Sequence, residues 1–254
     1  MPAETARPTA REIYERVIQD ARDELARPPS RLGFSALLAG ATVGLSGLAA
    51  AIAMSVLPHT PTATFVAALL YPIGFVAAIL GRSQLFTENT LYPVALVFAE
   101  RRHLGVTARL WVVVFVANAV GALLLALLVV ETGALGGHVA HELAALGTDV
   151  HSGPFAPNFW SAVVSGWLLA LVAWLVEAAE AAVGQFLIIA ALTFLVGLAK
   201  LDHSVASTAE VFTAMLNGSI GVASVAGWLG TVVLGNIVGG VGIVALLNYG
   251  QVRE

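Results

Sequence analysis

The chain has 254 residues, of which 58% are hydrophobic and only 11% are charged. Water-soluble domains carry about 25% charged residues, so these charges are too few to cover a soluble globule, and the mean hydropathy is +0.88. The formal net charge of −4 gives no indication of nucleic-acid binding, and the lack of cysteine excludes disulfides and thiolate metal sites. The composition therefore indicates an integral membrane protein.

The first 31 residues contain an amphipathic segment, from about Thr9 to Arg27. Apolar residues recur there at four-residue spacing among charged side chains, at Ile13, Val17, Ala21 and Leu25. This spacing defines one face of a helix, and two prolines follow it. We expect a short helix on the membrane surface or against a neighbouring subunit; a solvated helix without a specific role is an equal alternative.

Six long apolar segments follow, over residues 33–57, 62–99, 108–130, 159–176, 183–216 and 223–248. A helix needs about 20 residues to cross a hydrocarbon core about 30 Å thick. We therefore expect an all-α membrane domain with six transmembrane helices over residues 32–252. Segments 62–99 and 183–216 are much longer than one crossing requires.

The basic residues predict the orientation. Six of the twelve lie within the first 31 residues, Arg101, Arg102 and Arg109 lie between the second and third segments, and Arg253 follows the sixth. The longest connection, residues 131–158, contains no Lys or Arg. Positive charge favours the cytoplasmic side, so we expect both termini in the cytoplasm.

Polar residues interrupt both overlong segments, from Arg82 to Thr90 and from Lys200 to Ser207. These are the second segments of two three-segment halves, so they occupy matching positions. Matched interruptions are typical of inverted-repeat transporters at the substrate site. Unwound backbone at that depth is tolerated only where it lines a cavity or is buried in protein.

Five ionisable residues lie at these interruptions. Arg82 with Glu88, and Lys200 with Asp202, could be mutual pairs that merely brace the broken helices. His203 favours a functional interpretation, because imidazole titrates near neutrality and can donate a proton or a hydrogen bond to a solute.

The interruptions and the last segment resemble motifs of the formate/nitrite transporter family. The motifs are Leu85-Phe86-Thr87-Glu88-Asn89, Asp202-His203-Ser204-Val205-Ala206 and Leu234-Gly235-Asn236-Ile237-Val238-Gly239-Gly240. Their order and spacing are similar to those of the family, and the likeness covers residues 32–252. The runs 81–90 and 244–249 resemble an inner-membrane branch of that family.

The resemblance implies an aquaporin-like protomer, an inverted 3+3 repeat with helices two and five broken, in a homopentamer with one pore per protomer. It places His203 at the centre of the substrate pathway with Thr87 facing it, and Asp202, Glu88 and Asn89 beside them. It also implies apolar constrictions on both sides of the histidine, at Tyr71, Phe75, Leu85, Phe86 and Val196.

Three features depart from the family's pattern. Asp202 stands where Glu usually precedes the histidine, and Glu88 replaces a glycine after Thr87. A vestibule lysine and an asparagine early in the fourth span are replaced, by spacing, by Val150 and Gly166. A positive vestibule concentrates anions, so the missing lysine weakens the expected attraction.

We therefore expect an inner-membrane channel or transporter for small monovalent anions of weak acids, similar to formate or nitrite. An anion loses its hydration in an apolar constriction at high cost, which protonation or hydrogen bonding at His203 would reduce. A channel for water or another neutral small solute is the alternative, favoured by the missing lysine. The Asn-Pro-Ala motif of aquaporins is absent from both interruptions.

We expect no enzyme activity, cofactor or bound metal. Asp202, His203 and Ser204 are adjacent, whereas a nucleophile, its base and its orienting group come from separated segments. His138, His141 and His151 lie in the connection 131–158, where we expect solvated side chains rather than metal ligands.

Overall fold

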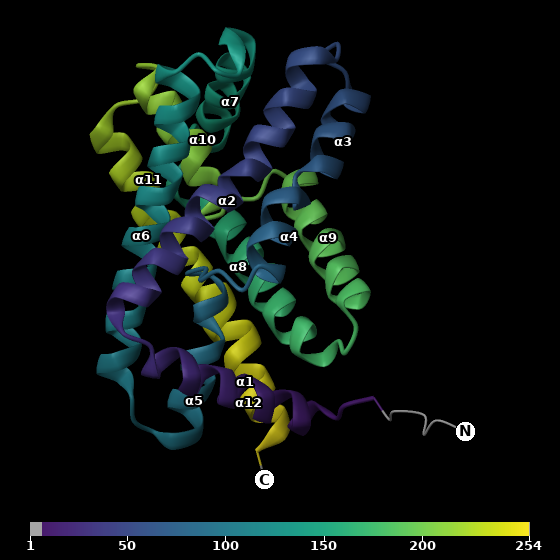
Figure 1. Cartoon of the computed structure of the whole chain (residues 1–254), viewed down its shortest axis with the longest axis vertical. Helices are drawn as coiled ribbons and strands as arrows, with labels where there is room; N and C mark the ends of the chain where they lie inside the picture. The colour runs from purple at the N-terminus through teal and green to yellow at the C-terminus, as the bar shows by residue number, and fades with distance from the viewer. Residues whose placement is uncertain (1–6, 254) are drawn as a thin grey trace.

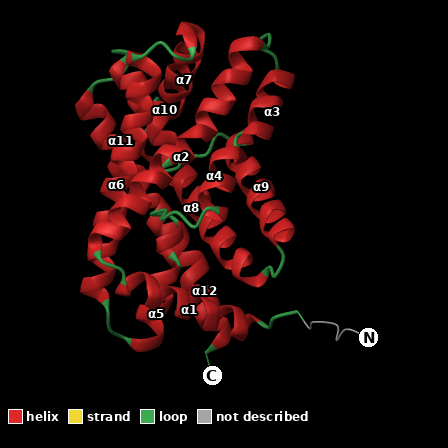
Figure 2. Cartoon of the chain, viewed as in Figure 1, coloured by secondary structure: helices red, strands yellow, loops and turns green. Residues whose placement is uncertain are grey.

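The computed structural model describes residues 7–253, and every regular element in that range is helical (Figures 1 and 2). The helices before the long connection are α1 (Ala10–Ala26), α2 (Pro29–Val56), α3 (Pro61–Leu70), α4 (Pro72–Leu80), η1 (Glu88–Thr90), α5 (Tyr92–Glu100) and α6 (Leu104–Glu131). Those from the connection onward are α7 (Gly136–His151), α8 (Phe155–Ala178), α9 (Ala182–Leu198), α10 (Ala206–Leu216), α11 (Val222–Ile237), the π-helical η2 (Val238–Ala245) and α12 (Leu246–Val252).

The amphipathic helix α1 forms where the sequence predicts it. Thr9 caps it, because its Oγ1 accepts a hydrogen bond from the Glu12 backbone N–H at 3.3 Å while the Glu12 carboxylate accepts one from the Thr9 N–H at 2.7 Å. Its buried residues are Ile13, Tyr14, Val17, Ile18 and Ala21. They pack against α5, α8 and α12 of the same chain. The chain's own helices therefore cover the apolar face of α1, and the expected position of this helix on the membrane surface or against a neighbouring subunit stays a prediction.

Tyr14 fixes α1 to the rest of the chain. Its hydroxyl donates a buried hydrogen bond to the Ala95 carbonyl of α5 at 2.8 Å, and burial raises the pKa of this phenol to about 12. We expect Tyr14→Phe to lower the free energy of unfolding by about 1 kcal/mol, the usual net contribution of one hydrogen bond. Thermal unfolding in detergent measures the change.

The matched control for this variant is Tyr249→Phe. The Tyr249 ring lies in the same cluster, 6.3 Å from the Tyr14 ring, and no hydrogen bond of its hydroxyl occurs within the described residues. The control should unfold like the wild type; equal losses in the two variants would contradict the assigned role of the Tyr14 hydroxyl.

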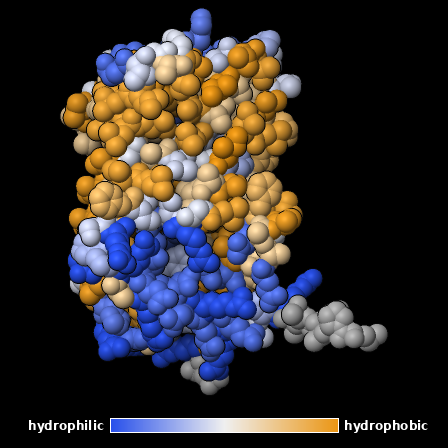
Figure 3. Space-filling view, in the orientation of Figure 1, coloured by the Kyte–Doolittle hydropathy of each residue, from blue (hydrophilic) through white to orange (hydrophobic). Residues whose placement is uncertain are grey.

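Five helical segments in the described range are long and apolar enough to cross a membrane. They are Pro29–Val56, Pro61–Leu80, Leu104–Glu131, Phe155–Ala178 and Val222–Val252, and the apolar α9 is shorter. Large exposed apolar side chains accompany them, including Phe34, Val56 and Leu104, which are 77%, 74% and 71% exposed. Figure 3 shows an apolar surface over most of this face and a hydrophilic surface at the end that contains α1 and α5. The chain is thus a helical membrane protein.

Glycines allow two helix pairs to approach closely. The space for a Cβ atom on Gly40 of α2 is occupied by the Asn118 backbone of α6, and that on Gly239 by the Val163 backbone of α8. Small residues at such spacing let helix backbones approach in membranes. Gly40 therefore lets α2 approach α6, and Gly239 lets η2 approach α8.

Two non-helical interruptions cross the middle of the molecule (Figure 2). The first interruption spans residues 81–91, apart from the short η1, and the second spans residues 199–205. The second residue of each is a basic residue in the left-handed region, Arg82 at φ 56° and Lys200 at φ 49°. The following N–H groups bond back in the same way, Ser83 to the Ala78 carbonyl at 3.0 Å and Leu201 to the Val196 carbonyl at 2.9 Å. Both are the helix-ending hydrogen bond that usually accompanies a left-handed residue.

The long connection 131–158 is largely helical. It contains α7, whose buried residues Leu143, Ala144 and Gly147 pack towards α10 and α2. The histidines, acids and glycines of this segment conceal its apolar face in the sequence. His138, His141 and His151 accordingly lie on a helix.

Candidate functional site

Two buried asparagines hold the interruptions in the same manner. Asn118 of α6 accepts a hydrogen bond from the Phe86 N–H at 3.0 Å and donates to the carbonyls of Ala36 and Gln84. Asn236 of α11 accepts from the Ser204 N–H at 2.9 Å and donates to the carbonyls of Ala162 and Asp202. Each amide therefore supplies the partners that unwound backbone lacks at this depth.

His203 and Thr87 meet between the two interruptions. His203 Nε2 lies 3.1 Å from Thr87 Oγ1, and both residues are fully buried. The Phe75 ring of α4 stands edge-on to the imidazole, with the ring centroids 5.2 Å apart. The structure therefore brings together the histidine and threonine that the family resemblance places opposite each other.

The other imidazole nitrogen caps α10. His203 Nδ1 accepts hydrogen bonds from the backbone N–H groups of Val205 and Ala206, at 3.2 and 3.0 Å. A ring nitrogen that accepts hydrogen bonds from two N–H groups carries no proton itself. The single proton of the neutral imidazole therefore lies on Nε2. In this geometry the imidazole is a neutral hydrogen-bond donor towards Thr87, and a second proton would displace the cap of α10.

The five predicted constriction positions occupy different places. Phe75 contacts the His203 ring, and Leu85 is fully buried beside Phe86 in the same apolar cluster. Tyr71 and Val196 line a cavity on the α7 side of the histidine. The Phe86 ring packs against Trp111 and Phe115 of α6, with centroids 6.0 and 5.3 Å away. Their role as constrictions remains a prediction.

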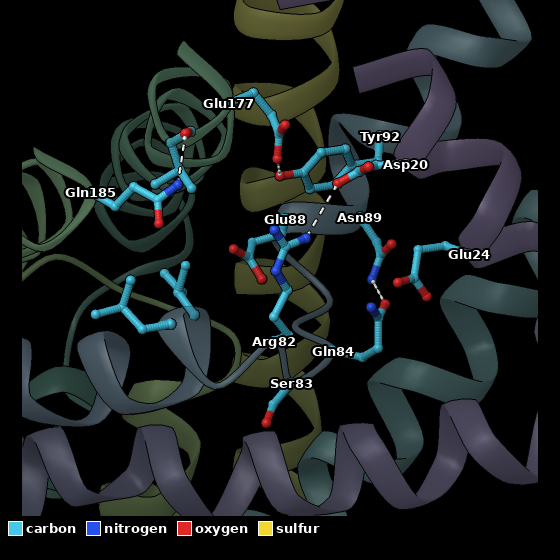
Figure 4. A pocket seen from close by; sticks show the side chains of 13 residues that line it. Asp20, Glu24, Arg82, Ser83, Gln84, Glu88, Asn89, Tyr92, Glu177 and Gln185 are labelled. Atoms are coloured by element: carbon cyan, nitrogen blue, oxygen red, sulfur yellow. Dashed lines mark hydrogen bonds and ion pairs between the residues drawn. The ribbon is translucent and has the colours of Figure 1, made fainter. Parts of the chain in front are cut away.

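A pocket opens on the α1 side of the His203–Thr87 pair (Figure 4), and we call it the α1-side pocket. Its polar lining comes from α1, the first interruption, α5, α8 and α9, and consists of Asp20, Glu24, Arg82, Ser83, Gln84, Glu88, Asn89, Tyr92, Glu177 and Gln185. Four of these side chains are acids and one is a cation, so the pocket is acidic overall. Arg82 lies 3.7 Å from Asp20, and the Tyr92 hydroxyl donates to Glu177 at 3.3 Å.

Burial changes the titration of one acid on α1. Glu24 forms an ion pair with Arg27 at 2.9 Å, yet its partial burial raises its pKa above the usual range. Asp20, Glu24 and Glu177 could not be assigned to a pocket from the sequence, because nothing in the local pattern of α1 or α8 shows that they converge.

A second cavity of about 80 Å³, the α7-side pocket, lies on the other side of the pair. Its polar lining is Thr64, Tyr71, Asp149, Lys200, Ser207 and Glu210, with apolar neighbours that include Val150 and Val196. Lys200 Nζ donates to Asp149 Oδ2 of α7 at 2.6 Å. The partners that the sequence suggests, Arg82 with Glu88 and Lys200 with Asp202, are therefore wrong; each cation pairs with an acid of another helix.

Three predicted pathway residues surround the central pair. Asp202 Oδ1 accepts a hydrogen bond from Trp228 Nε1 at 3.0 Å, and Asp202 lines a separate depression beside Lys200. The Asn89 amide donates to Gln84 Oε1 and to the Leu85 carbonyl, at 3.0 and 2.9 Å. Glu88 faces the α1-side pocket (Figure 4).

The departure at Gly166 has a structural reason, and the lysine missing at Val150 has a neighbour of the same type. Gly166 of α8 lies against the Asn236 backbone of α11, which occupies the space a Cβ atom would need. An asparagine cannot fit there without displacing α11. Val150 of α7 lines the α7-side pocket, as does Lys200. A lysine is therefore present in this pocket, although it comes from the second interruption.

Glu210 is a candidate that sequence reasoning missed. It is an acid in the middle of α10 and only 3% exposed. The signal lay in the sequence, because an ionisable residue within an apolar membrane segment is costly and usually functional. Within residues 7–253, no group of three or more His, Cys, Asp or Glu side chains is arranged to hold a metal ion.

Comparisons with known proteins agree with these features. The family model described as formate/nitrite transporter matches residues 11–250. The inner membrane protein YfdC of Escherichia coli is 32% identical over 245 residues, which cover 95% of this chain and 78% of YfdC.

Two solved structures share the fold. One, described as an "FNT family ion channel", has a TM-score of 0.85 at 21% identity, covering 94% of this chain and 98% of that one. Another, described as a "Pentameric formate channel with formate bound", has a TM-score of 0.75 at 17% identity, covering 89% and 98%. The chain belongs to the formate/nitrite transporter family.

Proposed function

We propose that this chain conducts small monovalent anions of weak acids, such as formate or nitrite, across the inner membrane. The observation that carries the proposal is the neutral, fully buried His203 donor between two pockets and beside apolar side chains. The family and the similar fold of the pentameric formate channel support the substrate class. The homopentamer, with one pathway in each protomer, rests on the same solved structure.

The corresponding contacts at the two interruptions support an inverted 3+3 repeat. Arg82 corresponds to Lys200, and Asn118 corresponds to Asn236, at the same spacing along the chain. In this proposal α2, α3–α5, α6, α8, α9–α10 and α11–α12 are six crossings, of which the second and fifth are broken. The α1 side is cytoplasmic and carries both termini, residues 1–31 lie outside the channel domain, and residues 32–252 form it.

His203 contributes by hydrogen bonding. The solute passes from one pocket to the other between Tyr71, Val196, Phe75 and Leu85, and the imidazole Nε2–H donates to a solute oxygen in place of Thr87 Oγ1. The N–H groups at the amino end of α10 bond to Nδ1 and so keep the proton of the ring on Nε2, facing the solute. This donor reduces the cost of removing water from the solute oxygens.

A second candidate function is the passage of water or a small neutral solute. The acidic α1-side pocket favours it, because Asp20, Glu24, Glu88 and Glu177 face a single cation there. Such a pocket repels anions at its mouth. Lys200 on the other side is already bonded to Asp149.

A solute panel in proteoliposomes tests the two candidates. Uptake of labelled formate and nitrite, and osmotic shrinkage for water and glycerol, are measured over a pH series beside protein-free liposomes. We expect formate and nitrite uptake above the protein-free rate, increasing as the external pH falls. Water or glycerol flux that does not depend on pH, with no anion uptake, would instead support the neutral-solute channel.

A further inference from the structure

Glu210 occupies a space that the fold keeps open for it. It lies on α10 and is 3% exposed, and its carboxyl group makes no hydrogen bond or ion pair with any residue of the described range. A Cβ atom on Gly47 of α2 would lie 2.5 Å from Glu210 Oε1. Gly147 of α7 packs directly on the Glu210 carbonyl. Gly47 therefore makes room for the side chain of this acid, and Gly147 lets the backbones of α7 and α10 approach each other.

The side chain faces the α7-side pocket, together with Ser207 of the same helix and Tyr71. An isolated carboxylate is far more costly to bury than a neutral carboxylic acid. A buried, unpartnered carboxyl at the wall of a cavity is therefore suited to hold a transferable proton.

The other titratable groups around the pocket are engaged or are poor proton donors. Asp149 is bonded to Lys200, and Asp202 is bonded to Trp228. Tyr71 is a phenol, which is a weak acid. No titratable side chain of α2, α6 or α11 lines this pocket within the described residues. Among the lining residues described, Glu210 is the acid without a partner.

The central histidine does not supply the proton in this geometry. Its Nδ1 accepts the two N–H groups that start α10, so the ring carries the single proton on Nε2. If a weak-acid anion is to cross the apolar segment as the neutral acid, the proton has to be added before the solute reaches His203.

We propose that Glu210 is the proton donor and binding group for a small carboxylate or nitrite-like anion in the α7-side pocket. This inference rests on the proposed function. The Glu210 O–H bond breaks, its proton forms an O–H bond with a solute oxygen, and the products are the neutral acid and a Glu210 carboxylate. A proton from the solution on the α7 side restores Glu210.

The test measures labelled formate uptake into proteoliposomes over a series of external pH values. Glu210→Gln keeps the shape of the side chain and removes its acid. We expect uptake at neutral pH to fall at least about tenfold, since general acids typically contribute roughly 10²–10⁴-fold, and we expect the rise in uptake at lower pH to flatten. The matched control is Glu131→Gln at the exposed end of α6, which should behave as the wild type.

Glu210→Asp distinguishes loss of the acid from a change in side-chain shape, because it keeps an acid in the pocket. It should be slower than the wild type and keep the pH dependence. Glu210→Gln with wild-type rates and an unchanged pH profile would overturn the donor role alone. If the wild type carries no weak acid at all, the proposed function fails, and the donor role fails with it. A flattened profile in both variants would also overturn the donor role, because it would follow the shape of the side chain rather than its acid.

Discussion

Replacing His203 with alanine is expected to lower formate uptake by roughly 100-fold, the effect of removing one preorganised donor from a dry site. The variant loses the Nε2 donor that faces Thr87 and also the Nδ1 acceptor that caps α10. Uptake into proteoliposomes over a pH series measures the loss. Purified oligomer size and thermal unfolding show whether the fold survives.

His203→Asn separates the two roles of the imidazole. Asparagine offers an amide oxygen that can accept the Val205 and Ala206 N–H groups, and its amide N–H donates hydrogen bonds but does not carry a transferable proton at neutral pH. If hydrogen bonding is the contribution of His203, this variant should keep uptake within roughly tenfold of the wild type, because one preorganised donor remains. A His203→Asn protein as inactive as His203→Ala would show that protonation of the ring is required.

The control for both variants is His59→Ala. The His59 side chain is 66% exposed and lies 3.4 Å from Glu142, away from the central pair. Uptake should be unchanged. Equal uptake in the wild type and His203→Ala would remove the histidine from the mechanism altogether.

Replacing Asn236 with leucine is expected to destabilise the protein strongly, and far more than Tyr14→Phe. The substitution leaves the Ser204 N–H and the carbonyls of Ala162 and Asp202 without their amide partner. The Ser204 N–H is then left without an acceptor, whereas both carbonyls still face the Ser165 hydroxyl. An orphaned buried group costs about 1–3 kcal/mol, and a hydrocarbon layer holds no water to replace the lost partner. We expect loss of folded protein, or a large decrease in the temperature of thermal unfolding in detergent.

Asn118→Leu should have a similar effect, since Asn118 makes the corresponding contacts with the first interruption. Asn248→Leu is the matched control. Its amide donates only to the Val244 carbonyl one turn earlier in its own helical segment, so the loss should be within about 1 kcal/mol. Equal unfolding temperatures for Asn236→Leu and Asn248→Leu would show that the amide does not hold the second interruption.

The sequence predicts the elements that depend on local composition. Apolar segments of adequate length, the proline after α1 and the polar runs beginning at Arg82 and Lys200 all appear near their expected positions. Helix α7 was missed because its apolar face is narrow and interrupted by polar residues. The π-helical η2 has no corresponding pattern, because three glycines among apolar residues are equally compatible with an α-helix.

The partners of charged residues were not predictable in the same way. Arg82 reaches Asp20 of α1 and Lys200 reaches Asp149 of α7, and these acids are distant in sequence. Glu88 and Asp202 are the acids nearest in sequence to Arg82 and Lys200, so the sequence predicts them as partners instead. The family resemblance predicts that His203 faces Thr87, which no local pattern indicates. Glu210 is hidden in the sequence because it stands within a long apolar segment whose length alone predicts a transmembrane helix.

The amides of Asn118 and Asn236 have a consequence for the contents of the pathway. They give protein partners to the Phe86 and Ser204 N–H groups and to the Gln84 and Asp202 carbonyls. Apolar constrictions can gate by losing their water. These four backbone groups keep their hydrogen bonds when the pathway loses its water, so drying of the pore does not leave them unbonded.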